Sequence, residues 1–334
     1  MLFFLILIIF FTCYTIYDKE SFLLLKENIR DIKYYYIIIC LVIICLYFLL
    51  QGIYMKSILN TLKHKISLKK GIFYSMLEFY FSGITPSSTG GQPVQLYYMT
   101  KDDIPIRKSY ITLMLNTIYF KIIILIMGIV ALLFKSDIIF SSRHIYIFFF
   151  ILGFVVDLAI ALIALLLVFK QNLVKRMLNK IVKIGKKTKI FRKKVENLKE
   201  DEILKLYNSE IDYIFSHKKT VVLNFLLTFV QRVLLFSIAY VIYRGLGFNT
   251  YSYFDLVMIQ VIVQVSIESF PLPGGAGLSE GLLHNIFVMI FASKLADVGM
   301  LLIRTFSFYI PLIVCGIIIL IYNIIISNKK ENVK

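Results

Sequence analysis

The sequence predicts an all-α integral membrane protein with about six full transmembrane helices and two broken re-entrant helical hairpins. Three observations lead to this fold class. Of the 334 residues, 59% are hydrophobic, whereas soluble domains are about 45–50% apolar. Long apolar runs recur along the whole chain, and two further apolar segments are interrupted by proline and glycine. A hydrophobic fraction above that of soluble domains is expected when helices face lipid.

Six apolar runs are candidate membrane spans, at about 1–17, 34–55, 109–134, 144–169, 220–243 and 299–326. Each approaches or exceeds the roughly 20 residues that a helix needs to cross about 30 Å of hydrocarbon. The first run has no basic segment before it and no small-residue cleavage site, so we interpret it as a retained span. We therefore expect one transmembrane domain over residues 1–334.

The basic residues predict the orientation. The net charge is +17, and Lys and Arg are concentrated in 56–70, in the loop 170–219 and in the tail after residue 328. Short loops rich in Lys and Arg stay in the cytoplasm, so we expect a cytoplasmic-membrane protein with both termini inside the cell. Because juxtamembrane cations are attracted to anionic lipid by about 1 kcal/mol each, the 170–219 loop is expected to contact the lipid surface. No nucleic-acid partner is expected.

Residues 71–100 and 253–292 each consist of two apolar arms around a break. The breaks, "TPSSTGGQPVQ" and "FPLPGGAGLSE", both place a Gly-Gly pair after a proline. The basic landmarks stay on one side only if each segment returns to the side from which it enters. We therefore predict two re-entrant hairpins of opposite direction, in inverted repeats over 34–134 and 220–326, as in many transporters. The alternative is that proline and glycine merely kink two long helices.

Two broken helices predict a polar cavity, because backbone that is not helical at membrane depth must be buried in protein or line water. Helix ends there offer N–H groups to a phosphate. We expect Arg232, Arg304 and Lys121 to meet an anionic headgroup, since a guanidinium can bind two oxygens. Glu280 is expected to pair with Arg304 or to receive a cationic headgroup. The remaining candidates lie at the breaks or within spans: Gly90, Gly91, Gln95, Gly274, Gly275, Gly277, Glu268 and Asp157. Glu78, like Glu268 and Glu280, flanks one of the two breaks.

Two other interpretations of these residues are an internal structural role and catalysis. The ionisable side chains could be internal ion pairs that hold helices together, for example Asp157 with Arg232. Catalysis has no visible support, because the cysteines form no CxxC motif, the histidines are scattered, and "GGAG" lacks the Lys-Ser/Thr of a P-loop. The sequence therefore predicts neither a metal site nor a cofactor.

Three stretches carry a resemblance to a known family: "ITPSSTGGQPVQLYYM" (84–99), "FPLPGGAGLSEG" (270–281) and "LLIRTFSFYIPLIVCG" (301–316). The chain resembles the transmembrane domain family of lysylphosphatidylglycerol synthase/flippase, the multiple peptide resistance factor. Gly277, Glu280 and Arg304 fall where the family pattern has them. The family often has an arginine shortly after the first Gly-Gly pair, where this chain has Gln95. It often has another in the following span, where this chain has Asn116 or Lys121.

The resemblance implies a flippase-like translocator of an anionic or aminoacylated phospholipid such as lysylphosphatidylglycerol, linked to cationic antimicrobial peptide resistance. The family's soluble aminoacyltransferase domain is not expected here, since the chain ends at Lys334 soon after its last span. Two alternatives stay open. One is a carrier for a small anion or a polyprenyl-phosphate. The other is a membrane scaffold that docks a separate synthase through 170–219 or forms a homo-oligomer.

Overall fold

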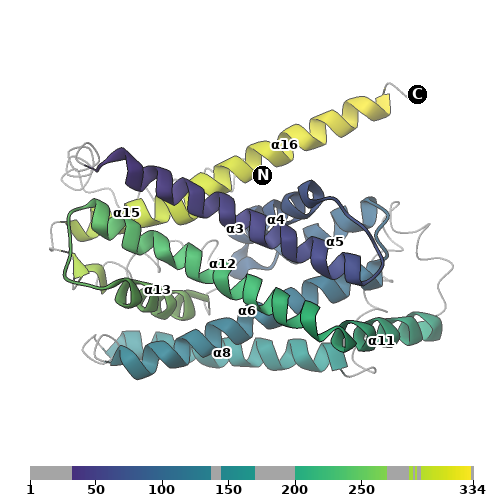
Figure 1. Cartoon of the computed structure of the whole chain (residues 1–334), viewed down its shortest axis with the longest axis horizontal. Helices are drawn as coiled ribbons and strands as arrows, with labels where there is room; N and C mark the ends of the chain where they lie inside the picture. The colour runs from purple at the N-terminus through teal and green to yellow at the C-terminus, as the bar shows by residue number, and fades with distance from the viewer. Residues whose placement is uncertain are drawn as a thin grey trace.

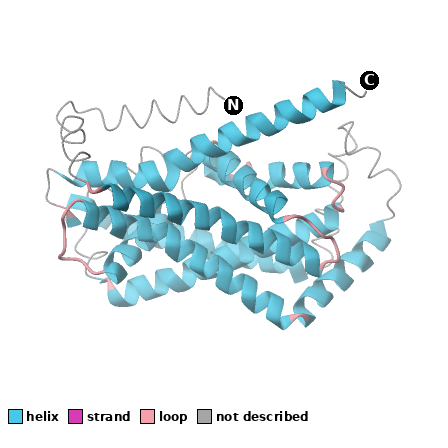
Figure 2. Ribbon diagram, turned by 45° about the horizontal axis from the view of Figure 1, so that its top comes forward, coloured by secondary structure: helices cyan, strands magenta, loops and turns pink. Residues whose placement is uncertain are grey.

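A computed structural model describes residues 32–136, 144–169, 200–268, 286–288, 290–291 and 295–331. The described chain is built from helices and contains no strand in these ranges (Figure 2). The all-α membrane fold class predicted from hydropathy is therefore confirmed.

Five helical segments in the described chain are long and apolar enough to cross a membrane. They lie along the long axis of the molecule and correspond to the predicted runs after the first (Figure 1). The run 1–17 lies outside the described residues. The five are α3 (Tyr34–Thr61), α6 (Ile106–Phe134), α8 (His144–Phe169), α12 (Lys218–Gly245) and a C-terminal segment made of α15 (Ala296–Arg304), η4 (Thr305–Tyr309) and α16 (Ile310–Glu331).

Apolar side chains cover the outside of the spans. On α8, Phe148, Ile151 and Val155 are all more than half exposed. A patch of this kind on a soluble protein would mark an interaction site. On membrane-length helices it is the surface that the acyl chains contact.

The break predicted within 71–100 is present. Helix α4 (Leu68–Gly83) is followed by a 3-10 turn, η1 (Pro86–Ser88), and by α5 (Gly91–Lys101). At 1.5 Å per residue the two helices are only about 24 and 17 Å long, so neither crosses about 30 Å of hydrocarbon. Both lie in the same half of the molecule beside α3 (Figure 1).

Glycines allow the hairpin to close. A Cβ at Gly91 would collide with the Ser82 side chain and lie 2.8 Å from the carbonyl oxygen of Glu78. A Cβ at Gly90 would lie 2.5 Å from the Thr85 methyl group. The Gly-Gly pair that the sequence singled out therefore lets α5 pack directly against the end of α4.

The second predicted hairpin is described in its first arm. Helix α13 (Tyr253–Glu268) is about 24 Å long and starts at the opposite end of the molecule from α4 (Figure 1). Ser252 and Asp255 form a reciprocal capping box at its start, with N···O distances of 2.8 and 3.3 Å. The predicted break lies outside the described residues, and so do Gly274, Gly275, Gly277, Glu280 and the side chain of Glu268.

The C-terminal span changes its winding halfway. After α15 ends at Arg304, η4 makes a π-helical turn before α16 begins. Pro311 explains the change, because its ring lacks an N–H and clashes with the carbonyl one turn earlier. Single π turns of this kind are frequent at functional sites.

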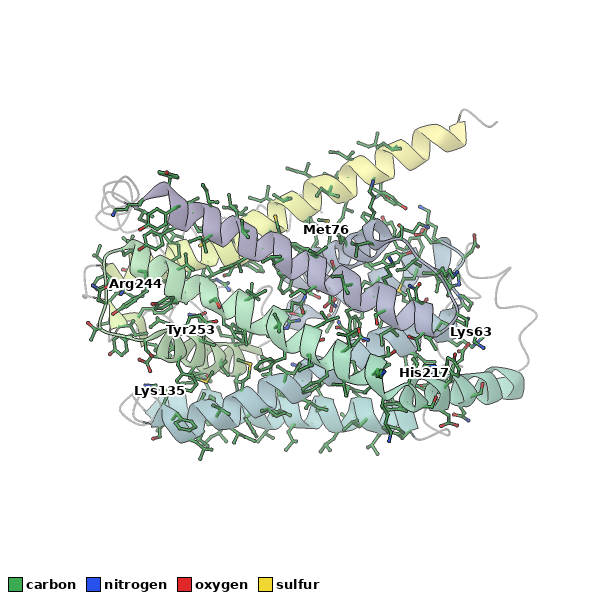
Figure 3. The ribbon with its side chains drawn as sticks, viewed as in Figure 1. Lys63, Met76, Lys135, His217, Arg244 and Tyr253 are labelled. Carbon is green, nitrogen blue, oxygen red and sulfur yellow. The ribbon has the colours of Figure 1, made fainter. Side chains whose placement is uncertain are left out.

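Part of the basic 170–219 segment is helical. Helix α11 (Glu200–Ser216) lies at the end of the bundle where Lys63 and His217 are found (Figure 3). Arg107, at the start of α6, donates from Nε to both carboxylate oxygens of Glu210 at 3.0 and 3.1 Å. This ion pair ties α11 to α6.

Candidate substrate-binding site

Four side chains from four helices form a polar cluster, in which the three amides are buried and the carboxylate is partly buried: Gln51 on α3, Glu78 on α4, Gln95 on α5 and Asn116 on α6. The amide nitrogens of Gln51 and Gln95 each lie 3.4 Å from Glu78 Oε2, and Asn116 Nδ2 donates to Oε1 at 3.2 Å. Gln51 also donates to Asn116 Oδ1 at 3.0 Å. The three amides are 3% exposed or less. Such a group inside a bundle of membrane spans indicates a functional site.

Close helix contacts bring the cluster together. A Cβ at Gly71 would lie 2.5 Å from the carbonyl oxygen of Gly52, so α3 and α4 touch backbone to backbone. Gln51 directly precedes Gly52, and Glu78 follows Gly71 by two helical turns on the same face. Gln95 follows Gly91, the hairpin glycine, by one turn. The glycine positions therefore determine that Gln51, Gln95 and Glu78 meet.

The cluster keeps unused hydrogen-bonding capacity. The Oε1 atoms of Gln51 and Gln95 are buried and have no hydrogen-bond partner among the described residues. Leaving a buried acceptor unsatisfied costs about 1–3 kcal/mol. A protein that keeps two such oxygens beside a carboxylate has acceptors available for a donor from outside the chain.

Arg232 lies at the middle of the 28-residue helix α12. Its guanidinium carbon is 4.0 Å from the centre of the Phe120 ring and 5.6 Å from that of Tyr47. The neighbouring Gln231 donates to the backbone carbonyl of Tyr47 at 3.2 Å, one helical turn before Gln51 on α3, and the Nε of Arg232 has no hydrogen-bond partner among the described residues. The sequence-predicted Arg232 therefore lies next to the polar cluster.

Aromatic rings connect the cluster to Arg304. The ring of Tyr47 lies 6.0 Å from that of Phe79, which lies 6.3 Å from that of Phe308. The guanidinium of Arg304 is 4.9 Å from the centre of the Phe308 ring. These edge and tilted contacts are typical of stabilising aromatic pairs. The two arginines thus stand at opposite ends of one set of rings, which runs past Glu78.

Lys121 and Asp157 form an ion pair apart from the cluster. The Lys121 Nζ and Asp157 Oδ1 atoms are 2.5 Å apart, with the residues 8% and 0% exposed. The suggested pairing of Asp157 with Arg232 is therefore wrong. Lys121 lies on the face of α6 that meets α8. The ring of its neighbour Phe120 contacts the guanidinium of Arg232.

Sequence reasoning missed two participants. Gln51 and Tyr47 were not singled out, because each is one polar or amphipathic residue inside a long apolar run. The available signal was the amide of Gln51 in mid-span, since polar groups in membrane helices usually face a partner or a cavity. What it would face could not be inferred from its neighbours in the chain.

Membrane-length helices, a broken pair of short helices and a polar cluster between the spans together define a multi-pass membrane protein with a polar site. The chain belongs to the family of lysylphosphatidylglycerol synthase transmembrane regions, whose model matches residues 1–315. It is also similar to a UPF0104 membrane protein of Archaeoglobus fulgidus, with 23% identity over 301 residues and 86% of each chain covered. No solved structure matches the chain.

Proposed function

We propose that the protein moves an anionic or aminoacylated phospholipid, such as lysylphosphatidylglycerol, between the two leaflets of the membrane. Family membership supports the class of substrate, since the family is described by lysylphosphatidylglycerol synthase. An aminoacylated lipid exposed on the outer leaflet would reduce the negative charge of that leaflet. The leaflet would then attract cationic peptides less strongly. This connects translocation to the peptide resistance that the resemblance implies.

One observation carries the proposal: three amides hold Glu78, and the Arg232 guanidinium stands over the ring of Tyr47, one helical turn from Gln51 of the same cluster. An aminoacylated headgroup carries an ammonium group and a phosphate. Glu78, with the free oxygens of Gln51 and Gln95, offers acceptors for the ammonium group. The planar guanidinium of Arg232 suits the phosphate. An acidic and a basic group in one region of the bundle therefore match both ends of the headgroup.

Several of the remaining site predictions concern the second half of the proposed site. We propose that Arg304, at the start of the π turn, contacts the phosphate on the far side of the aromatic rings. Glu280, Glu268 and the glycines Gly274, Gly275 and Gly277 stay predictions for that half. Gly90 and Gly91 shape the first hairpin, and the ion pair of Lys121 with Asp157 supports a structural role for both residues.

The arrangement of the short helices supports an alternating mechanism. Helices α4 and α13 start at opposite ends of the bundle and both are too short to span it. We propose that they belong to the inverted repeats 34–134 and 220–326, and that rocking of one repeat against the other opens the cluster to each leaflet in turn. In the proposed orientation the termini are cytoplasmic and 170–219 contacts anionic lipid.

Reconstituted vesicles test this function. The purified protein is placed in vesicles containing lysylphosphatidylglycerol, and a membrane-impermeant amine reagent reports how fast the lipid reaches the outer leaflet. We expect Glu78→Gln and Arg232→Gln to slow exposure by about tenfold or more, since each removes a charge-assisted contact.

Asp212→Asn makes the same chemical change as Glu78→Gln at an exposed position of α11 and should leave the rate unchanged. Equal rates in all four proteins would refute the proposal, as would transport of a soluble anion without lipid redistribution.

A further inference from the structure

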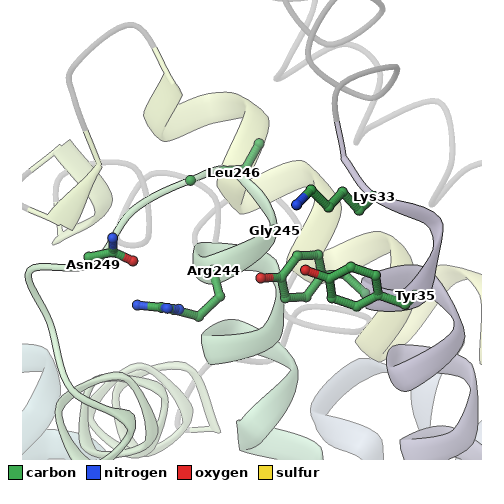
Figure 4. A pocket seen from close by; sticks show the side chains of 8 residues that line it. Lys33, Tyr35, Arg244, Gly245, Leu246 and Asn249 are labelled. Atoms are coloured by element: carbon green, nitrogen blue, oxygen red, sulfur yellow. The ribbon is translucent and has the colours of Figure 1, made fainter.

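A pocket lined by basic and aromatic side chains lies at the end of the bundle opposite to Lys63 and His217. It has a volume of about 380 Å³ and is formed where the start of α3 meets the end of α12. Lys33 and Tyr35 come from the α3 side, and Arg244 and Asn249 come from the α12 side and the turn after it (Figure 4). Figure 3 shows Arg244 at this end of the molecule.

The charges of this pocket are not neutralised within the described chain. Neither Lys33 nor Arg244 pairs with a carboxylate among the described residues. By contrast, Lys135 at the same end is paired with Asp255. Two cations that line one pocket without an acidic partner repel each other, and an anion between them relieves that repulsion.

The neighbouring groups suit a phosphate. Lys33 occupies the N-cap position of α3, at the end of the helix where the first N–H groups carry a partial positive charge. The side chains of Asn249 and Tyr35 add hydrogen-bond donors. Arg244 is only partly buried and Lys33 is exposed, so a ligand can enter from the membrane surface.

The position favours a lipid as the source of the phosphate. Three consecutive tyrosines, Tyr34 to Tyr36, begin α3, and Tyr34 is 76% exposed. Aromatic residues of this kind sit at the level of the headgroups. The exposed apolar side chains of α3, including Ile38 and Ile39, follow directly along the helix. A phosphate in the pocket would therefore leave its acyl chains beside an apolar surface.

We propose that this pocket binds the phosphate of an anionic phospholipid headgroup at the membrane surface. It would serve as a docking site at one end of the path, distinct from the polar cluster at mid-span. Its role as a docking site rests on the proposed function, lipid translocation. Binding itself requires no translocation.

Competitive lipid retention tests the binding site. Protein is purified in detergent with equal amounts of phosphatidylglycerol and phosphatidylcholine, and the retained lipids are counted by native mass spectrometry. We expect the double variant Lys33→Gln with Arg244→Gln to lower the ratio of phosphatidylglycerol to phosphatidylcholine by about tenfold. Lys219→Gln removes a charge at the other end of α12 and should leave the ratio unchanged. A double variant that retains the wild-type ratio, or an equal loss in Lys219→Gln, would overturn the site.

Two further experiments distinguish a lipid phosphate from a soluble phosphate, and binding in the pocket from lipid translocation. Glycerol 3-phosphate at millimolar concentration should not displace the lipid; if it does, the pocket binds a soluble phosphate and the lipid assignment is wrong. Glu78→Gln should keep the retention ratio while it slows exposure of lysylphosphatidylglycerol. If retention depends on the pocket but no protein moves lipid, the pocket stands and the translocation proposal fails. If Glu78→Gln lowers retention as much as the double variant does, the lipid is bound at the cluster and the pocket proposal fails.

Discussion

The guanidinium of Arg232 lies over the ring of Phe120 at 4.0 Å from its centre, although the two residues belong to different helices and are more than 100 positions apart. The same ring lies 5.0 Å from the ammonium group of Lys121. One aromatic side chain therefore contacts the cation beside the polar cluster and the cation of the buried ion pair. The contact orients Arg232 without neutralising it, which keeps the charge available to a ligand.

Replacing this ring tests its role. We expect Phe120→Leu to lower the free energy of unfolding by about 1–2 kcal/mol, because the cation–π contact is lost from a site shielded from water. It should also slow lipid exposure, since Arg232 is no longer held in place. Thermal melting in detergent and the vesicle assay measure the two effects. Phe148→Leu, on the lipid-facing side of α8, is the control, and an equal response in both variants would contradict the assignment.

Glu78 can be tested by two replacements that differ in hydrogen bonding. Glu78→Gln keeps an acceptor for the surrounding amides, whereas Glu78→Ala leaves their donors unsatisfied at about 1–3 kcal/mol each. We expect Glu78→Ala to melt at a clearly lower temperature than Glu78→Gln, while both lose lipid exposure. A common loss of activity with different stabilities separates the role of the charge from the role in folding. If Glu78→Gln exposes lipid normally, the charge has no part in transport.

The ion pair of Lys121 with Asp157 should behave as a structural tie. Asp157→Asn leaves a buried ammonium group without its carboxylate, and breaking one side of a buried pair costs about 3–5 kcal/mol. Replacing both residues, Lys121→Met with Asp157→Leu, removes the charges together and should recover most of that loss. Melting temperatures of the two variants and the wild type provide the comparison. A double replacement as unstable as the single one would show that the pair does more than neutralise charge.

Gly153 on α8 should be intolerant of a side chain. A Cβ there would overlap the carbonyl oxygen of Val265 on α13, which is backbone and cannot rotate away. We expect Gly153→Ala to destabilise the protein by at least about 1–3 kcal/mol, the usual cost of overpacking. Gly128→Ala, at the same junction, would meet its nearest atom at 3.4 Å and is the matched control. Similar melting of both variants would mean that α13 is not held this tightly against α8.

His64 gives a pH dependence that can be checked outside the membrane spans. It lies in the turn between α3 and α4, where burial, followed by the charges of Lys108 and Lys70, lowers its pKa below the ordinary value of 6.5, and Asp103 opposes the shift. The unfolded chain therefore binds the proton more readily than the folded protein. The contribution of His64 to stability is present above about pH 6.5 and is lost as the pH falls.

The corresponding measurement compares melting temperatures at about pH 7.5 and 5.5, on either side of the ordinary histidine pKa. Wild type should lose more stability on acidification than His64→Gln, in which no proton can be taken up at this position. Identical pH profiles would show that His64 does not contribute.

Hydropathy and the Pro-Gly breaks were sufficient to predict the membrane class, the positions of the described spans and the interruption at 84–90. These features are local, because a helix needs only enough consecutive apolar residues to cross the bilayer and a break needs only residues that cannot continue it. The importance of Arg232 and Glu78 could be suspected for the same reason, since a charge in an apolar run is costly wherever it points.

The partners of those charges were decided only by the tertiary structure. Gln51 and Asn116 are 65 positions apart, and nothing in either apolar run specifies the other. Asp157 met Lys121 rather than Arg232 because the rotation of each helix about its axis is set by side-chain packing against its neighbours. The contacts at Gly52, Gly71 and Gly153 fix how closely those helices approach. The sequence determines which helices enter the membrane. Lipid tails are as apolar as the helix faces, however, so hydrophobicity does not select which faces pair. Only close packing between helices decides which polar groups meet.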